Sequence, residues 1–194
     1  MNELQETRND MIADVGLDPA AAFPVLDSLA DAGARYVKDA RINLKNTLAS
    51  DHLTGKETAL LAYAIAVNNQ HAGLRAAFAR RAADAGATAE EIAEMAACAS
   101  LLSVNNVFYR FRHFVNKESY SQKQARIKMT IMARPVTGKL FFELASLAVS
   151  SVNGCEACVA SHEHSVLEAG ATEDQIFDAV RLAAVVTGTG KLLG

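Results

Sequence analysis

An internal repeat is the feature that most constrains the fold of this chain. The tetrapeptide Ala-Gly-Ala-Thr at residues 85–88 returns 84 positions later, at residues 169–172. At the same offset Asn69 aligns with Asn153, and Ile92 aligns with Ile176. Because a solenoid unit is shorter than this, the repeat predicts two related units packed against each other.

Helix-capping signals recur at matching places in the chain. Thr54, Thr88 and Thr172 are each followed three residues later by Glu or Gln, which is the sequence pattern of a capping box. Gly86 and Gly170 stand where a left-handed residue ends a helix. The chain is 51% hydrophobic with only 6% aromatic residues and three prolines, which favours closely packed helices. We therefore expect an all-α protein.

The same signals predict where each helix lies. We expect helices at residues 24–33, 34–48, 55–68, 71–84, 89–102, 103–115, 122–133, 138–152, 154–168 and 173–187. Residues 1–29 are expected to form an N-terminal extension, and residues 30–194 a single helical domain. Within that domain one half spans about 54–115 and the other about 122–194.

Charge and hydropathy exclude several classes of function. A net charge of −3 and a pI near 5.9 give no overall electrostatic signature of nucleic-acid binding. The polar N-terminus lacks the apolar core of a signal peptide, and no apolar run reaches the roughly 18 to 20 residues that span a bilayer. A cytoplasmic protein is expected. In the basic and aromatic run at 105–113, we expect Phe108 and Phe111 to pack, and Arg110 and Arg112 to reach carboxylates or a subunit boundary.

Residues able to perform thiol chemistry gather in the second half. Cys155 and Cys158 form a Cys-x-x-Cys pair, His162 follows four residues later, and Glu143 is the only charged residue between positions 140 and 152. At the repeat offset these four positions are occupied by His71, Leu74, Phe78 and Ala59 in the first half. The chemistry is therefore expected in the second half alone.

The local pattern suggests how the two thiols are activated. Asn153 is expected to cap a helix, with Glu156 completing the capping box. Both cysteines then lie in the first two turns, where free N–H groups and the helix dipole lower a thiol pKa. The spacing places Cys155, Cys158 and His162 on one face, with His164 roughly opposite in solvent. Proximity to the helix end favours Cys155 as the more acidic and exposed thiol, whereas contact with His162 favours Cys158.

The acidic residue Glu143 shares a helical face with Leu140, Leu144 and Leu147, so we expect it to be buried. Burial raises the pKa of a carboxyl group toward neutrality and makes it a proton acceptor. A buried charge requires a partner, and His162 or a thiol is the natural one.

Structural explanations compete with these functional ones. The two cysteines could simply pack as small apolar residues, although the added histidine and carboxylate favour a functional site. A zinc site using His162 or His164 is disfavoured, because ligands from one continuous helix cannot easily surround a tetrahedral metal. We therefore expect no metal site. Outside the motif we expect Cys98 to be buried packing, His52 to be solvated and His71 to be an exposed first-turn residue.

The pattern Glu143-x11-Cys155-x2-Cys158-x3-His162 resembles the AhpD family of alkyl hydroperoxidases, within the wider carboxymuconolactone decarboxylase-like group. The segments 36–44, 105–112, 142–155 and 159–164 resemble it too, and the likeness runs from about residue 30 to the end. One departure is Ala157, where the family usually has a histidine. The resemblance implies an all-helical fold that self-associates, typically as trimers.

The same resemblance implies an activity and a role for each site residue. It implies reduction of organic hydroperoxides or peroxynitrite without a bound cofactor, with Cys158 as peroxidatic thiol and Cys155 as resolving thiol. Glu143 would be the general base and His162 the proton relay. Dihydrolipoamide on a lipoylated protein would supply electrons, and a peroxiredoxin, AhpC, would be a partner. A non-redox decarboxylase or lactone-processing enzyme using Glu143 and His162, and a non-catalytic partner-binding module, remain alternatives.

Overall fold

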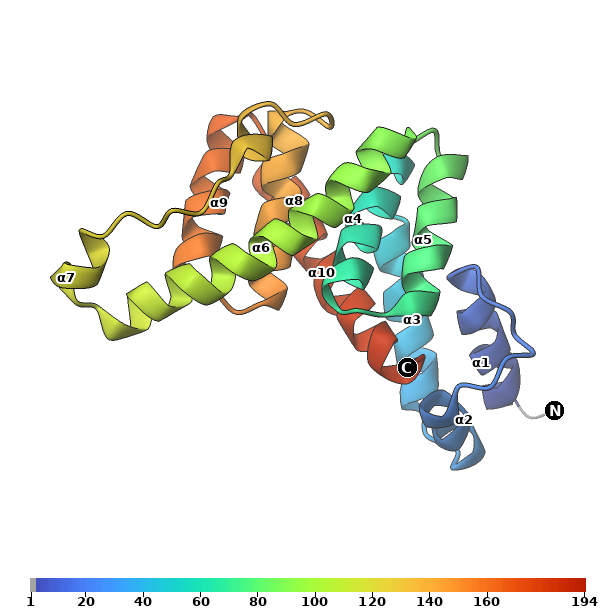
Figure 1. Ribbon diagram of the computed structural model, residues 1–194. Helices are drawn as coiled ribbons and strands as arrows, with labels where there is room; N and C mark the ends of the chain where they lie inside the picture. Colours follow the sequence, from blue (N-terminus) through green and yellow to red (C-terminus); the bar gives the residue numbers. More distant parts are fainter. Residues whose placement is uncertain (1–2) are drawn as a thin grey trace.

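Helices make up most of the computed structural model, which describes residues 3–194 (Figure 1). No strand occurs among those residues, so the all-α prediction is confirmed. The elements in chain order are α1 (Glu3–Asp14), α2 (Pro24–Asp31), α3 (Tyr36–Leu48), α4 (Gly55–Asn68), α5 (Ala72–Asp84), α6 (Ala89–Val115), α7 (Glu118–Ser121), the 3-10 turn η1 (Thr130–Ala133), α8 (Lys139–Val152), α9 (Glu156–Glu168) and α10 (Glu173–Leu192).

The repeat seen in the sequence is also a repeat of helices. Both ends of α4 and of α5 recur 84 residues later as the ends of α8 and of α9, and α6 and α10 begin at that same offset. The three predicted capping boxes at Thr54, Thr88 and Thr172 are all formed. Gly86 and Gly170 adopt the expected positive φ after α5 and α9. The internal repeat is therefore confirmed at the level of backbone geometry.

The equivalent helices α4 and α8 lie at the centre of the core. The side chains at positions 58–62 and 64–66 of α4 are buried, as are all those at 141–150 of α8. Such a helix is apolar on nearly every side because other helices surround it. Helices α5, α6, α8 and α10 pack against α4, and α6, α9 and α10 pack against α8. This arrangement puts Glu143 inside the protein.

The stretch expected to be an N-terminal extension contains α1 and most of α2, and residues 1 and 2 lie outside the described part of the chain. Met11 and Ile12 of α1 are fully buried and belong to the same core cluster as α4. The Arg8 guanidinium contacts the Asp27 carboxylate at 2.7 Å, which joins α1 to α2. These helices therefore add to the core of the domain.

Several predicted helices differ from the structure. Residues 89–102 and 103–115 form one continuous helix, α6, because neither proline nor glycine interrupts the segment. Residues 122–133 are not a helix and run as an irregular connection that ends in η1. Its backbone is held from outside: Arg112 donates a hydrogen bond to the Lys123 carbonyl, and Arg126 adopts a positive φ. In addition, α10 continues five residues beyond its predicted end.

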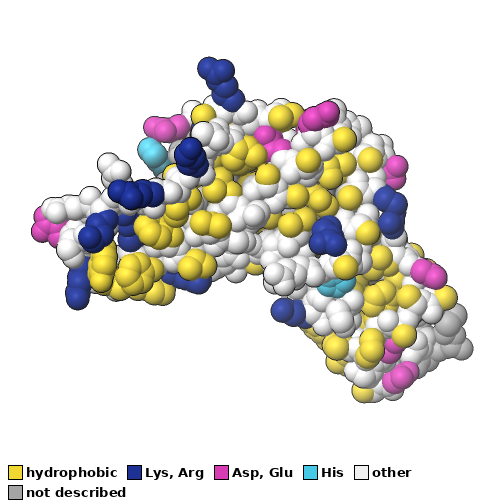
Figure 2. Space-filling view, in the orientation of Figure 1, with side chains coloured by type: hydrophobic (Ala, Val, Ile, Leu, Met, Phe, Trp, Pro, Cys, Tyr) yellow, Lys and Arg dark blue, Asp and Glu magenta, His cyan; other side chains and the backbone are white. Residues whose placement is uncertain are grey.

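The second half of α6, together with α7 and the connection after it, projects from the body of the molecule (Figure 1). We call residues 104–137 the arm. Residues 110–139 contain eight of the 19 lysines and arginines but one of the 22 acidic residues. Figure 2 shows Lys and Arg side chains gathered at that end. None of the described helices is both long and apolar enough to cross a membrane.

The aromatic and basic residues of the arm lie differently from the prediction. Phe111 is exposed and contacts Tyr120 edge-on, instead of packing in the core. Arg110 and Arg112 donate to backbone carbonyl oxygens, of Asn153 and Lys123, and not to carboxylates. Arg112 also stacks over Phe108, 4.6 Å from the ring centre. Both arginines therefore hold loops in place.

Candidate active site

The turn between α8 and α9 positions the Cys-x-x-Cys pair. Asn153 closes the C-terminus of α8, Gly154 adopts a φ of +66°, and Cys155 is the residue immediately before α9. The prediction that Asn153 caps α9 in a box with Glu156 was wrong by two positions. Because α8 continues as far as Val152, Asn153 completes that helix, and the glycine provides the left-handed residue that reverses the chain.

Cys155 and Cys158 are joined by a disulfide, with their Cα atoms 5.2 Å apart. Cys158 is the third residue of α9 and so belongs to the first turn, whose N–H groups have no partner within the helix. Cys155 is completely buried, whereas Cys158 keeps 7% of its surface exposed. The expectation that Cys155 would be the more exposed thiol was therefore wrong. In this arrangement Cys158 is the accessible sulfur.

Glu143 and His162 meet across the turn, as the sequence predicted. The Glu143 Oε2 atom lies 2.6 Å from His162 Nδ1, and both residues are buried. The second carboxylate oxygen, Oε1, accepts a hydrogen bond from the Lys139 ammonium group one turn earlier on α8. Lys139 was missed because it lies just outside the apolar stretch, although its i,i+4 spacing from Glu143 is a recognised ion-pair signal.

The pKa of Glu143 differs in direction from the prediction. Burial by itself would raise the pKa of this carboxyl group. Hydrogen bonds and positive charge from His162 and Lys139 outweigh burial, and the pKa lies below the ordinary value. The residue is therefore an ionised carboxylate near neutral pH, not a nearly neutral acid. An ionised carboxylate accepts a hydrogen bond from the Nδ1–H group of His162, which leaves Nε2 as the nitrogen of the imidazole ring that can exchange a proton.

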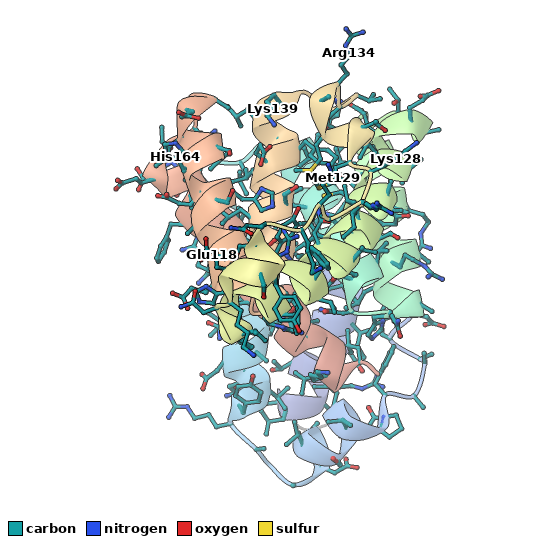
Figure 3. All side chains as sticks on the ribbon, turned by 60° about the vertical axis from the view of Figure 1, so that its left-hand side comes forward. Glu118, Lys128, Met129, Arg134, Lys139 and His164 are labelled. Carbon is teal, nitrogen blue, oxygen red and sulfur yellow. A yellow bond between two sulfur atoms is a disulfide. The ribbon has the colours of Figure 1, made fainter. Side chains whose placement is uncertain are left out.

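A cavity of about 350 Å³ opens beside Cys158. Residues from α6, α9 and the arm connection line it: Asn105, Tyr109, Met129, Met132, Ala157, Cys158, Ser161 and His162. In Figure 3 Met129 lies on the connection that passes in front of α8 and α6. The sequence analysis named Cys158 and His162 but missed the walls contributed by Asn105, Tyr109 and the two methionines. No periodic pattern marks a methionine in an irregular segment as part of a site.

The connection that forms one wall is fastened at two points. The buried carboxylate of Glu94 on α6 accepts hydrogen bonds from the Val136 N–H, the Thr137 N–H and the Thr137 hydroxyl, at 2.6 to 2.8 Å. The Asn105 amide nitrogen lies 3.1 Å from the Met129 sulfur. Such fastening holds Met129 and Met132 against the cavity, because a carboxylate with several short hydrogen bonds is strongly retained.

A network of asparagines lies beneath the turn and joins the two halves. Asn68 and Asn153 exchange side-chain hydrogen bonds of 2.9 and 3.1 Å. Asn153 also donates to Asn106, which in turn donates to the Ser150 hydroxyl. The Arg110 guanidinium donates to the Asn153 carbonyl at 2.6 Å. The turn that carries both cysteines is thus fixed from the first half of the molecule.

The other histidines and the third cysteine lie apart from this cavity. His164 is exposed beside Glu168, and it points away from α9 in Figure 3. His52 is exposed as expected, but His71 is partly buried and caps α5, so the prediction of an exposed residue was wrong. Cys98 is buried as predicted, and burial raises the pKa of its thiol to about 12. Within residues 3–194, no group of three His, Cys, Asp or Glu side chains is arranged to hold a metal ion.

Comparison with known proteins places the chain in a family. The model of the carboxymuconolactone decarboxylase family matches residues 36–107 and 125–193. The chain belongs to this family. The two matched segments contain the two helical halves, and the unmatched residues between them contain α7 and the end of α6.

The curated relatives within that family are AhpD proteins. The alkyl hydroperoxide reductase AhpD of Anaeromyxobacter dehalogenans strain 2CP-C is 44% identical over 163 residues, 83% of this chain and 86% of that protein. The AhpD of Beijerinckia indica is 40% identical over 169 residues, 87% and 93% of the two chains. The chain is therefore an AhpD-like member of the family, as the motif predicted.

A solved structure shares the fold. A gamma-carboxymuconolactone decarboxylase subunit, so titled, from Burkholderia xenovorans superposes with a TM-score of 0.71 over 99% of this chain and 96% of the other. At 18% sequence identity this likeness concerns the helical architecture alone.

Proposed function

We propose that the protein is an alkyl hydroperoxide reductase that uses Cys158 and Cys155 in a disulfide cycle. One observation carries the proposal: Cys158 and His162 line the same cavity, while the buried Glu143 holds the far side of the histidine. The relatives that are 40 to 44% identical to this chain are named alkyl hydroperoxide reductase AhpD, which supports the proposal. A thiol, an imidazole and an ionised carboxylate are the groups that thiolate chemistry with a peroxide requires.

The first step oxidises Cys158. Its thiolate sulfur forms a bond to the terminal oxygen of the hydroperoxide while the O–O bond breaks. The electron pair of that bond leaves with the alkoxide, which takes up a proton and departs as an alcohol. The sulfur has then lost two electrons and is a sulfenic acid. Access favours Cys158 for this step, because Cys158 faces the cavity and Cys155 is fully buried.

The second step makes the disulfide. The Cys155 sulfur attacks the sulfur of the sulfenic acid, an S–S bond forms, and the hydroxyl leaves as water after taking up a proton. The disulfide in the structure supports this step, because the turn brings the Cys155 and Cys158 sulfurs within bonding distance. A dithiol then restores both thiols by exchange and becomes a disulfide itself. Dihydrolipoamide fits this role, since a slender dithiol can enter a cavity of about 350 Å³ where a protein surface cannot.

The roles of Glu143 and His162 follow from their contact. The lowered pKa of Glu143 makes it a weak base, so direct removal of the thiol proton by its carboxylate is disfavoured. Its hydrogen bond fixes the Nδ1 proton of His162 and leaves Nε2 to take the proton of Cys158 and return it to the alkoxide. In this scheme Glu143 positions the imidazole ring and His162 transfers the proton. Ala157 supplies no further imidazole between the cysteines.

Counting thiols tests the proposal directly. Fully reduced protein is mixed with equimolar cumene hydroperoxide, and free thiols are titrated under denaturing conditions. We expect two of the three thiols per chain to disappear and to return after treatment with dihydrolipoamide. A titre that hydroperoxide leaves unchanged would refute the redox cycle. A non-redox decarboxylase or lactone-processing enzyme, which the family description also covers, would keep its activity after loss of both cysteines.

We further propose that the arm is where copies of this chain associate. Val104, Val107, Phe111 and Phe114 are exposed at alternating spacings of three and four, which makes an apolar stripe along α6. The arm is basic, whereas the remainder of the chain is acidic, so the arm of one copy complements the body of the next. Head-to-tail contacts of this kind close into rings, and a trimer is the assembly that we propose. An AhpC peroxiredoxin and a lipoylated protein are the redox partners that accompany this proposal.

A further inference from the structure

Asn105 is the one side chain of the cavity with a buried polar atom left unpaired. Within the described part of the chain, only His71 Nε2 and Asn105 Oδ1 are buried side-chain polar atoms without a hydrogen-bond partner. Asn105 is 5% exposed and lines the cavity beside Cys158 and His162, whereas His71 lies outside it. The amide nitrogen of Asn105 is held by the Met129 sulfur, which leaves the carbonyl oxygen without a donor.

The neighbouring residue shows how unusual this is. Asn106 is also buried on α6, yet both ends of its amide are paired, the nitrogen with Ser150 and the oxygen with Asn153. A buried carbonyl oxygen without a hydrogen-bond donor destabilises a protein, so such groups are rare unless a ligand satisfies them. The unpaired oxygen of Asn105 therefore indicates a hydrogen-bond donor that is supplied from the cavity.

We infer that Asn105 binds the substrate by accepting a hydrogen bond from the O–H group of the hydroperoxide. This inference rests on the proposed function and adds a substrate-binding residue to it. The O–H hydrogen sits on the terminal oxygen, which is the atom that the Cys158 sulfur attacks. Holding that hydrogen fixes the terminal oxygen while leaving the alkoxy oxygen free to receive the proton from His162. The χ2 torsion of asparagine is broad, so the amide can turn toward an occupant of the cavity.

The rest of the cavity sets the class of substrate. Tyr109, Met129 and Met132 present apolar surface from α6 and the arm connection, opposite the polar groups on α9. A cavity of about 350 Å³ with polar groups on one side and apolar surface on the other fits a compact alkyl or aryl hydroperoxide. The organic group contacts the methionines, and the hydroperoxide group contacts Asn105, Cys158 and His162. Dialkyl peroxides lack the O–H group and are excluded on this ground.

The decisive variant is Asn105→Leu, which keeps the approximate shape and removes the acceptor. The reduced protein is reacted with cumene hydroperoxide, and separately with methyl methanethiosulfonate, which modifies thiols but has no hydrogen-bond donor. We expect the rate with the hydroperoxide to fall by roughly two- to tenfold, the equivalent of one hydrogen bond. The rate with the thiosulfonate is expected to stay at the wild-type value.

Stability separates substrate binding from a structural role. If the Asn105 oxygen is unpaired in the free protein, Asn105→Leu removes an unsatisfied polar atom, and the melting temperature stays the same or rises. If Asn105 served only the fold, the substitution would instead lower the melting temperature and leave the rate of reaction with the hydroperoxide unchanged. Asn105→Asp keeps an acceptor of the same size and is expected to react with the hydroperoxide faster than Asn105→Leu. If Asn105→Leu does not fold, Asn105→Asp is compared with the wild type, and a rate close to that of the wild type is expected. Ser165→Ala removes a hydroxyl from α9 outside the cavity and is the control.

The outcomes distinguish this inference from the proposed function. If the wild type itself loses no thiols to hydroperoxide, the redox cycle fails and Asn105 has no such substrate to bind. If the wild type reacts and Asn105→Leu reacts equally fast, the cycle stands and the role of Asn105 is refuted. Equal slowing with both reagents would mean that the substitution disturbs the thiol itself, and this would also refute the inference.

Discussion

His71 and Cys155 occupy the same place in the two halves of the molecule. Each residue lies 84 positions from the other, and each is the N-cap of its helix, α5 or α9. His71 uses its Nδ1 atom to accept the Leu74 N–H at 3.1 Å, whereas Cys155 makes no side-chain capping bond and is bonded to Cys158 instead. The two halves therefore share a backbone but use the helix start for different purposes.

The first prediction transfers the cysteines to the other half. In a chain carrying Cys155→Ser and Cys158→Ser, the changes His71→Cys and Leu74→Cys place two thiols in the equivalent geometry. We expect a disulfide to form with diamide, because the backbone places the two positions as in α9. We expect no reaction with equimolar hydroperoxide, since Ala59 and Phe78 stand where Glu143 and His162 would be. Mass spectrometry of alkylated protein measures both results.

Rapid loss of the transferred thiols to hydroperoxide would contradict the importance of the Glu143–His162 pair. Leu74 is buried, and its replacement costs about 2–4 kcal/mol by analogy with other large-to-small core changes. Helicity of the variant, measured by circular dichroism, therefore has to be confirmed first.

The second prediction concerns pH and Glu143. Because the pKa of Glu143 is lower in the folded than in the unfolded chain, its charge stabilises the fold above the unfolded value of about 4.3. That stabilisation disappears as the pH falls through the folded pKa, which lies below that unfolded value. Glu143→Gln is expected to lower the free energy of unfolding by about 1–3 kcal/mol at pH 7.

Urea unfolding of both proteins at pH 7, 5 and 3 measures this difference, which should shrink only in the most acidic sample. A difference that is equally large at every pH would show that the charge of Glu143 does not contribute. Lys139→Met, which removes the partly exposed partner of the same carboxylate, is expected to have a smaller effect.

The third prediction assigns the two thiols. Cys155→Ser leaves Cys158 without its partner, so the sulfenic acid formed by hydroperoxide persists and reacts with dimedone. Cys158→Ser removes the sulfur that faces the cavity, so its dimedone labelling is expected to be at least tenfold lower than that of Cys155→Ser. Labelling that survives only in Cys158→Ser would reverse the assignment.

The fourth prediction is that Cys98 is inert. Burial raises the pKa of its thiol to about 12, so almost none of it is ionised at pH 8. Iodoacetamide is expected to leave Cys98 unmodified in the native protein and to modify it in urea. Cys98→Ala should keep the rate of reaction with hydroperoxide, and labelling of native Cys98 within minutes would contradict the prediction.

The fifth prediction tests association through the arm. Phe114 is 72% exposed, and Phe114→Glu puts a charge in the apolar stripe of α6. We expect the variant to sediment as a smaller species than the wild type at the same concentration. Phe177→Glu is the matched control, since Phe177 is 67% exposed but lies on α10 outside the stripe. Dissociation by the control alone would place the interface elsewhere.

Much of the fold could be predicted because its signals are local. Each threonine cap and each glycine after a helix acts within a few residues, so both ends of α4, α5, α8 and α9 were predicted to within two residues. The starts of α6 and α10 were also predicted correctly. Residues 122–133 were wrongly predicted as a helix because distant groups determine their conformation: Arg112 donates to the Lys123 carbonyl, and the Asn105 amide contacts the Met129 sulfur. A local pattern contains no information about such contacts.

The site was predictable to the same extent. The contact of Glu143 with His162 was predicted because a buried charge needs a partner and because His162 lies one turn after Cys158 on the next helix. The direction of the Glu143 pKa did not follow, because Lys139 stands outside the apolar stretch and its hydrogen bond was not foreseen. Asn105 and Met129 were missed because a cavity wall is made by residues that meet only in three dimensions.

One wall of the cavity lies outside the helices that the two halves share. Met129 and Met132 come from the connection between α7 and α8, which contains no helix besides the turn η1. Contacts with the side chains of Glu94 and Asn105 hold this connection in place. The reacting groups are thus encoded by the duplicated framework, whereas part of the shape that meets the substrate is encoded by a separate segment. Exchanging this segment between relatives offers a way to alter selectivity among hydroperoxides without rebuilding the reaction centre.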